Sequence, residues 1–110
     1  MEQRRTRRFK LQLPLSITRT GAERVMVAGH TDNISSSGVL FTAEREPDLG
    51  GPIEYIITLS HEGGQPVSLR CIGKVLRSQL LPAVDYPNYQ VAATLERYEF
   101  VRDREFAAVR

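Results

Sequence analysis

Residues 67–77 read Val-Ser-Leu-Arg-Cys-Ile-Gly-Lys-Val-Leu-Arg and form the longest strand pattern in the chain. Every second position from Val67 to Val75 holds an apolar residue or a glycine, which is the period of a strand with one buried face. Gly73 lies inside this pattern, and a glycine within a strand marks a bend or the close approach of another backbone. We therefore expect a long strand over residues 67–77 with one of these two features at Gly73.

Five further segments have the composition of strands and follow one another at hairpin-like spacings. Residues 9–17 alternate between apolar and polar side chains, and Pro14 falls on the polar side, where a missing hydrogen-bond donor is tolerated. The other four segments are residues 25–30, 39–42, 53–59 and 89–95. Because a closed sheet has no exposed edges, the sequence predicts a mainly β protein, a small six-stranded antiparallel β-barrel.

The last part of the chain has a different period. At about 100° per residue, five apolar side chains fall on one stripe, and Phe100 falls outside it. The five are Leu95, Tyr98, Val101, Phe106 and Val109. This pattern predicts a C-terminal α-helix at about residues 97–109, packed against the barrel.

The composition is that of one ordinary globular domain. The chain has 110 residues, of which 41% are hydrophobic and 25% charged, so it can bury a single core. No apolar run is long enough to span a bilayer, and no apolar segment of a signal peptide follows the basic N-terminus. Cys71 is the only cysteine, so an internal disulfide is impossible. We expect a cytoplasmic protein that does not bind membranes.

Positive charge is concentrated at the N-terminus. Residues 1–10 contain four arginines and one lysine against one glutamate, a net charge of +4, so the other hundred residues carry −2 of the total of +2. Nucleic-acid-binding domains usually spread basic residues over a whole face, and this local cluster favours a small anionic partner instead. We expect residues 1–8 to form a flexible basic arm and residues 9–110 to form the barrel with its helix.

Catalytic chemistry has little support in the sequence. His30 and His61 are far apart, and neither accompanies a nucleophile in a known motif. One cysteine and two histidines do not provide the spacing of a zinc site. We therefore expect no enzymatic activity, no metal and no cofactor.

The polar segment 31–38, Thr-Asp-Asn-Ile-Ser-Ser-Ser-Gly, can serve either of two purposes. Asn33 and Ser35 can bond to neighbouring backbone and stabilise a tight turn between strands. The same amide and hydroxyl can bond to a ligand, and Gly38 can allow a ring or a phosphate to approach the backbone. A structural turn and a binding loop are both consistent with this segment taken by itself.

Two motifs considered together are more informative. Residues 4–8 fit the pattern R-R-x-x-R and residues 33–38 fit [D/N]-x-S-x-x-G, in that order and about thirty residues apart. This combination resembles the PilZ domain, the bacterial receptor module for cyclic di-GMP. Segments 73–77 and 89–91 are similar to strands of that family, so the resemblance covers nearly the whole chain.

The resemblance implies a receptor that holds cyclic di-GMP between the arm and the loop. Guanidinium groups suit this ligand because they can form paired hydrogen bonds with phosphate oxygens and with the O6/N7 edge of guanine. Asn33 occupies a position where aspartate is commoner in the family, and Asp32 lies one place earlier. The ligand-binding residues that the resemblance assigns are Arg4, Arg5, Arg8, Asn33, Ser35 and Gly38.

The signal of such a receptor is expected to pass to a protein effector, because the chain carries no output domain. Two alternatives stay open. One is a nucleic-acid-binding β-barrel that uses the arm as a phosphate clamp, against which the net acidic body argues. The other is a PilZ-like interaction module that has lost its ligand.

Overall fold

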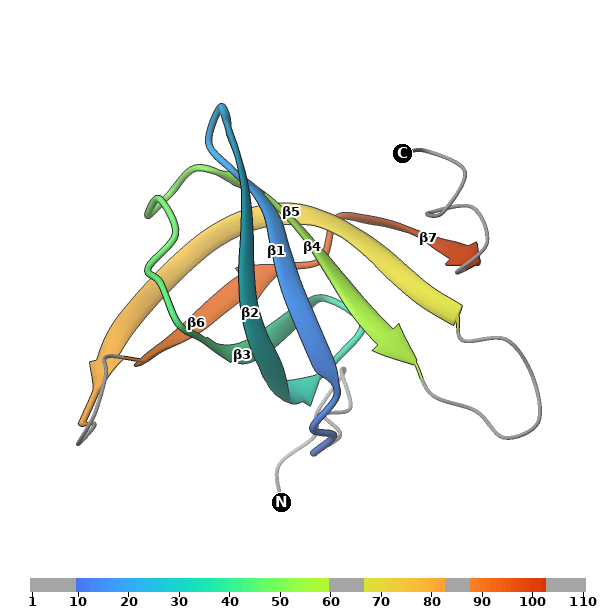
Figure 1. Ribbon diagram of the computed structural model, residues 1–110, viewed down its shortest axis with the longest axis horizontal. Coiled ribbons are helices and arrows are strands. Elements are labelled where there is room, and N and C mark those ends of the chain that lie inside the picture. The colour runs from blue at the N-terminus through green and yellow to red at the C-terminus, as the bar shows by residue number, and fades with distance from the viewer. Residues whose placement is uncertain (1–9, 60–66, 83–87, 103–110) are drawn as a thin grey trace, which may run out of the picture.

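The computed structural model describes residues 10–59, 67–82 and 88–102, and its regular structure in these ranges is entirely β (Figure 1). The strands are β1 (Pro14–Thr20), β2 (Glu23–Ile34), β3 (Gly38–Ala43), β4 (Pro52–Leu59), β5 (Val67–Leu81), β6 (Asn88–Thr94) and β7 (Arg97–Arg102). No helix occurs within the described ranges. The mainly β class expected from the sequence is confirmed.

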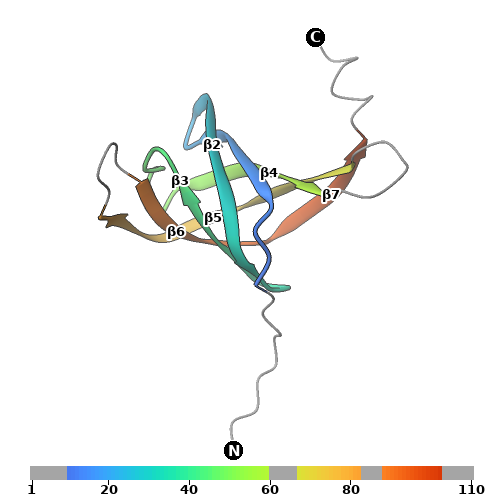
Figure 2. The same ribbon diagram turned by 60° about the horizontal axis from the view of Figure 1, so that its bottom comes forward.

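Six of the strands close into an antiparallel barrel. Their hydrogen-bonded order is β4-β1-β2-β3-β6-β5, and β4 also pairs with β5, which joins the two ends of the series. This confirms the six-stranded antiparallel barrel. Figure 2 shows the start of β1 at the same end of the barrel as the connection between β2 and β3.

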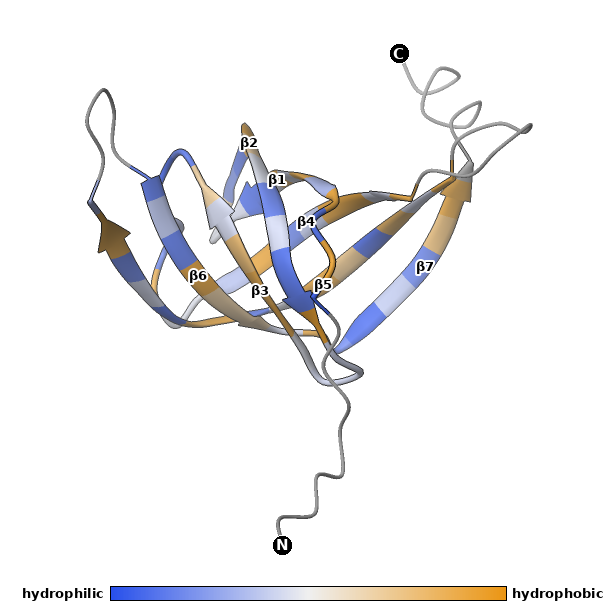
Figure 3. Cartoon of the chain, turned by 90° about the horizontal axis from the view of Figure 1, so that it is seen from below, coloured by the Kyte–Doolittle hydropathy of each residue, from blue (hydrophilic) through white to orange (hydrophobic). Residues whose placement is uncertain are grey.

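Side chains alternate between buried and more exposed positions along β3, β4 and β6, and Figure 3 shows hydrophobic and hydrophilic residues interspersed along the strands. In β3, Phe41 is buried while Leu40 and Thr42 face outward. Phe41 packs against Tyr55 with ring centroids 5.6 Å apart, and the Tyr55 hydroxyl donates to the carbonyl oxygen of Thr94 at 3.1 Å. The buried apolar residues are Leu15, Ile17, Val27, Val39, Phe41, Ala43, Ile53, Tyr55, Ile57, Cys71, Val75, Val91 and Ala93.

β5 is the strand on which the barrel closes, and it appears as the long arc in Figure 1. Its first half, through Lys74, pairs with β4, and its second half, from Val75, pairs with β6. A Cβ atom on Gly73 would lie 1.8 Å from the carbonyl oxygen of Thr94, so no side chain fits at this position. The close backbone approach expected at Gly73 is therefore confirmed, although the strand continues to Leu81.

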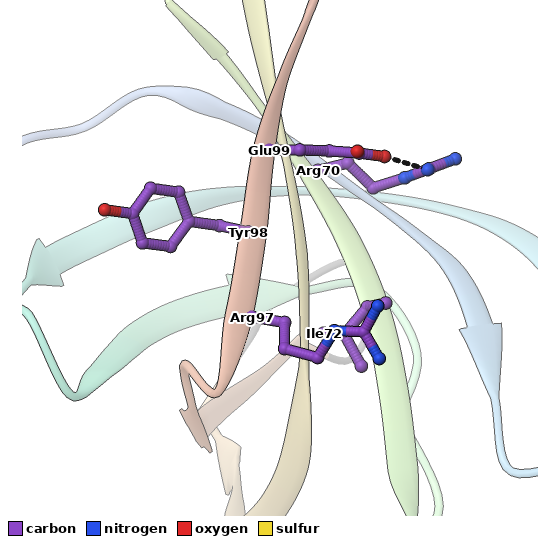
Figure 4. A pocket seen from close by; sticks show the side chains of 5 residues that line it. All are labelled: Arg70, Ile72, Arg97, Tyr98 and Glu99. Carbon is purple, nitrogen blue, oxygen red and sulfur yellow. Dashed lines mark hydrogen bonds and ion pairs between the residues drawn. The ribbon is translucent and has the colours of Figure 1, made fainter.

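The predicted C-terminal helix is wrong over residues 97–102, which form β7. β7 pairs with residues 67–72 of β5. Figure 4 shows Tyr98 on the opposite side of β7 from Arg97 and Glu99, as the pleat of a strand requires, and Arg70 of β5 donates to Glu99. The remaining residues of the expected helix, 103–109, lie outside the described residues.

The physical reason for this difference is a strand edge that would otherwise lack hydrogen-bond partners. β6 reaches only the second half of the 15-residue strand β5, so the first half has a free edge on that side. β7 supplies partners for the backbone groups along that edge. The sequence of residues 97–102 fits a period of two as well as a helical stripe, and the available edge decides between them.

The boundaries of several strands also differ from the expectation, and two of these differences matter for the predicted ligand-binding residues. The segment 31–38 is a loop only in part, because β2 continues to Ile34. Residues 10–13 lie outside β1, which begins at the exposed Pro14. Both changes concern the region where the predicted ligand-binding residues lie.

Replacing Gly73 by alanine should destabilise the barrel by about 3 kcal/mol, the upper range for adding one methyl group to a packed site. The new Cβ would collide with the backbone of Thr94, which cannot move away as a flexible side chain would. The measurement is the free energy of unfolding in urea. Gly51→Ala is the matched control, since a Cβ there would make only an ordinary contact with Asp48 at 3.6 Å. Equal stability losses in both variants would contradict this account of barrel closure.

The protein should lose stability in alkaline solution because of its buried Cys71 and Tyr55. Burial raises the pKa of the Cys71 thiol from 9.0 to about 12 and also raises the pKa of Tyr55. Between about pH 9 and pH 12 the unfolded chain therefore binds fewer protons than the folded one, so the free energy of unfolding falls as pH rises. In Cys71→Ala, urea unfolding should show a shallower fall across this window; an unchanged slope would exclude a contribution from the thiol.

Candidate functional site

The connection between β2 and β3 is a tight turn built around one hydroxyl group. The Ser35 hydroxyl donates to the carbonyl oxygen of Gly38 at 3.2 Å and accepts from the amides of Ser37 and Gly38 at 3.4 and 3.2 Å. The Ser35 amide also donates to the Gly38 carbonyl oxygen at 2.9 Å. A hydroxyl has one proton to donate and two lone pairs, so these bonds use its full capacity. Ser35 is buried and fixes the shape of the turn.

Gly38 is required by the neighbouring strand. It pairs with Thr94 of β6, and a Cβ atom at this position would lie 2.9 Å from the carbonyl oxygen of Ala93. Just after β6, the Leu95 amide donates to the carbonyl oxygen of Ser37 at 2.9 Å. The turn is thus attached to the end of β6, and the absence of a side chain at Gly38 allows the two strands to approach.

A β-bulge precedes the turn and sets the direction of Asn33. Thr31 pairs with Phe41 and Asn33 pairs with Leu40, so Asp32 is an extra residue in β2. Residues paired in antiparallel strands share a face, so Thr31 joins the buried Phe41 while Asn33 joins the outward-facing Leu40. Without the extra residue, Asn33 would face the core.

Asp32 lies on the same outer face as Asn33. One of its carboxylate oxygens accepts from the Thr42 hydroxyl at 2.8 Å and from the Gln90 side-chain amide at 3.4 Å. The other lies 3.4 Å from Nε2 of His30. The bulge therefore presents two consecutive polar residues on the outside of the barrel, an acceptor-only carboxylate and an amide that both donates and accepts.

A shallow depression of about 150 Å³ lies on the outer face beside the turn. Apolar residues Leu40, Ala92 and Leu76 line it, and Leu76 is 62% exposed. Leu76 is the extra residue of a second bulge, located in β5. Arg77 also lines the depression, is exposed, and forms no ion pair within the described part of the chain.

These groups suit a ligand that combines flat rings with phosphates. Apolar side chains such as Leu76 can pack against a base, and the Arg77 guanidinium can bind phosphate oxygens or the edge of a guanine. Asp32 and Asn33 offer oxygens to the N–H groups of a base.

The start of the described chain is attached next to this site. The Thr31 hydroxyl donates to the carbonyl oxygen of Leu11 and accepts from the Leu13 amide at 2.9 Å. The Thr31 amide donates to the carbonyl oxygen of Leu13, also at 2.9 Å. The segment 10–13 is therefore held against Thr31, at the end of the barrel that carries the turn.

Three of the six predicted ligand-binding residues lie in the described part of the chain, and the structure brings these three together. Asn33, Ser35 and Gly38 lie in one bulge and the turn that follows it. Arg4, Arg5 and Arg8 lie outside the described residues. The role of all six toward a ligand stays a prediction.

Sequence reasoning missed two residues of this region. Asp32 offered a signal, since it precedes Asn33 directly and a bulge can turn consecutive side chains to one face. Arg77 offered none, because β5 reaches the turn only through the pairing of β5 with β6 and of β6 with β3.

Other kinds of site find no support in the described ranges. They contain no group of three or more histidine, cysteine, aspartate or glutamate side chains that could hold a metal ion. They also contain no helix with the length and apolar character needed to cross a membrane.

Comparison with known proteins identifies the family. A family model described as the PilZ domain matches residues 2–84, a range that includes the arginine cluster, the turn and β1 to β5. Searches of curated proteins and of solved structures each returned no match. The matched range is more than half of the 110 residues, and it contains five of the six barrel strands. The chain belongs to the PilZ domain family.

Proposed function

We propose that this protein is a receptor for cyclic di-GMP and that it holds the ligand between its N-terminal arginine arm and the outer face of the barrel. The observation that carries the proposal is the attachment of Leu11 and Leu13 to Thr31. Thr31 directly precedes the bulge that presents Asp32 and Asn33. The chain that leads to the arm is therefore held beside the loop motif, although the two motifs are about thirty residues apart in the sequence.

The size of the depression supports a role for the arm. At about 150 Å³ it is smaller than the pockets of about 300 Å³ or more that enclose drug-sized ligands. The depression on the barrel can therefore contact only part of a cyclic dinucleotide. The arginines of the arm would supply the remaining contacts by covering the exposed side of the ligand.

The proposed contacts divide by chemistry. Arg4, Arg5 and Arg8 bind phosphates and guanine edges through paired hydrogen bonds. Asn33 bonds to a guanine edge, and the neighbouring Asp32 carboxylate supplies the negative charge that an asparagine lacks. Ser35 and Gly38 act through the shape of the turn, since the bonds of the Ser35 hydroxyl and the contact of Gly38 with β6 are already in place.

The proposed mechanism is ordering of the arm by the ligand, followed by recognition of the covered surface by a protein effector. PilZ domains are binding and adaptor modules, and this chain would act in the same way, in the cytoplasm and without catalysis. Ordering a segment on binding costs conformational entropy, which the phosphate contacts of the arm must offset.

Substituting Arg4 or Arg8 by alanine should weaken the binding of cyclic di-GMP by about 10- to 100-fold, the effect of losing hydrogen bonds to a charged group. Titration calorimetry with the intact protein measures the dissociation constant and the stoichiometry together. The thermal midpoint without ligand should stay nearly unchanged, because the proposal assigns these arginines to the ligand and not to the fold.

Arg7→Ala is the matched control, since Arg7 occupies a variable position of the motif and its loss should change affinity by less than about threefold. No heat with the wild-type protein at tens of micromolar ligand would refute the proposed function. Equal, strongly salt-dependent binding of a single-stranded RNA would favour the nucleic-acid alternative instead.

Arg77→Ala should weaken the binding of cyclic di-GMP by about fivefold to tenfold, because it removes an exposed cation beside the apolar depression. Arg24, an exposed arginine near the far end of β2, is the control and should be neutral when replaced by alanine. Calorimetry at two salt concentrations measures both variants. Unchanged affinity in Arg77→Ala would remove this residue from the site.

A further inference from the structure

Thr31 is a polar residue on the inner face of the barrel, where most buried side chains are apolar. It is 0% exposed and shares the inner face of the sheet with Phe41, its partner in β3. A buried hydroxyl is costly unless it is hydrogen-bonded, so its partners show what it holds. Both partners of the Thr31 hydroxyl belong to the segment that precedes β1: the Leu13 amide and the Leu11 carbonyl oxygen.

These bonds attach to the barrel a segment that takes no part in the strand pairing of the sheet. β1 begins at Pro14, whose partner in β2 is His30, so residues 10–13 lie outside the ladder. The Thr31 amide adds one bond to the carbonyl oxygen of Leu13, but within the described part of the chain Leu11 bonds only to the hydroxyl. The hydroxyl therefore extends the attached part of the chain from Leu13 back to Leu11.

The point of attachment is also adjacent to the candidate ligand site. Thr31 is followed by the bulged Asp32 and by the outward-facing Asn33. Thr31 therefore connects two parts of the molecule. Its hydroxyl holds the chain that leads to the arm, and its backbone continues into the bulge.

We propose that Thr31 is a positioning residue for ligand binding, which acts by fixing the point from which the arginine arm leaves the barrel. This inference rests on the proposed function, since it concerns the affinity for cyclic di-GMP. Thr31 is buried and touches no ligand itself. Its effect is to shorten the length of chain between the arm arginines and the last attached residue.

The expected size of the effect follows from chain lengths. Arg8 is three residues from Leu11, which is at most about 10 Å of extended chain, and five residues from Leu13, about 17 Å. Releasing Leu11 while Leu13 stays attached would enlarge the volume open to the Arg8 backbone by about fivefold. The effective concentration of the arm at the site would fall by the same factor.

The test compares Thr31→Val with Thr20→Val in the full chain. Both substitutions keep the shape of a buried threonine and remove one hydroxyl that bonds to backbone, since the Thr20 hydroxyl accepts from the Asp48 amide at 2.7 Å. Thr20 ends β1 at the opposite end of the strand from the arm. Calorimetry should show about fivefold weaker binding of cyclic di-GMP in Thr31→Val and less than about twofold in Thr20→Val.

Thr31→Ser should restore the affinity, because serine keeps the hydroxyl that holds Leu11 and Leu13. A residue that matters only for packing would not be rescued in this way, since serine lacks the methyl group. If valine prevents folding, Thr31→Ser and Thr31→Ala provide the same comparison, because they differ from each other only by the hydroxyl.

Hydrogen exchange of the Leu13 amide without ligand provides an independent measurement. Exchange should be slow in the wild type and faster in Thr31→Val, and an unchanged rate would overturn the inference. Failure of the wild type to bind cyclic di-GMP would refute the proposed function, and the positioning role with it, while the exchange rate still reports on the attachment itself. Wild-type affinity in Thr31→Val, with faster exchange at Leu13, would overturn the positioning role and leave the proposed function intact.

Discussion

The passage of β5 across the end of β6 is the constraint on which the rest of the structure depends. Gly73 lies against the backbone of Thr94 because it has no side chain, and one strand can therefore pair with β4 through its first half and with β6 through its second. This change of partner closes the barrel and leaves an edge for β7. It also carries Leu76 and Arg77 to the outer face beside the turn between β2 and β3.

Much of this fold could be predicted from the sequence, because a strand with one buried face alternates in hydropathy. The six barrel strands were recognisable for that reason, and Gly73 stood out as a glycine inside the longest of them. Residues 97–102 were misread because their alternation is also compatible with a helical stripe. The free edge of β5 decides between a strand and a helix. This edge exists because β6 pairs only with the second half of β5, which leaves one side of the first half open to β7.

The candidate site was predictable to a smaller extent. Asn33, Ser35 and Gly38 of the motif lie in one bulge and the turn that follows it, but a motif does not say what each residue does there. Ser35 and Gly38 have full structural explanations in the turn and in the contact with β6. Arg77 and the attachment of Leu11 to Thr31 depend on contacts between distant segments, which the order of residues does not reveal.

The bulge at Asp32 has a consequence for how the chain is aligned with its family. The first position of the loop motif can be matched to Asn33 or, if one residue is treated as an insertion, to the aspartate before it. In a regular strand this choice would matter, since the two side chains would point to opposite faces. Here both point outward, so the ambiguity in the alignment corresponds to no ambiguity in space. A comparison made column by column would record only Asn33 at this position, although the Asp32 carboxylate lies on the same face of the barrel.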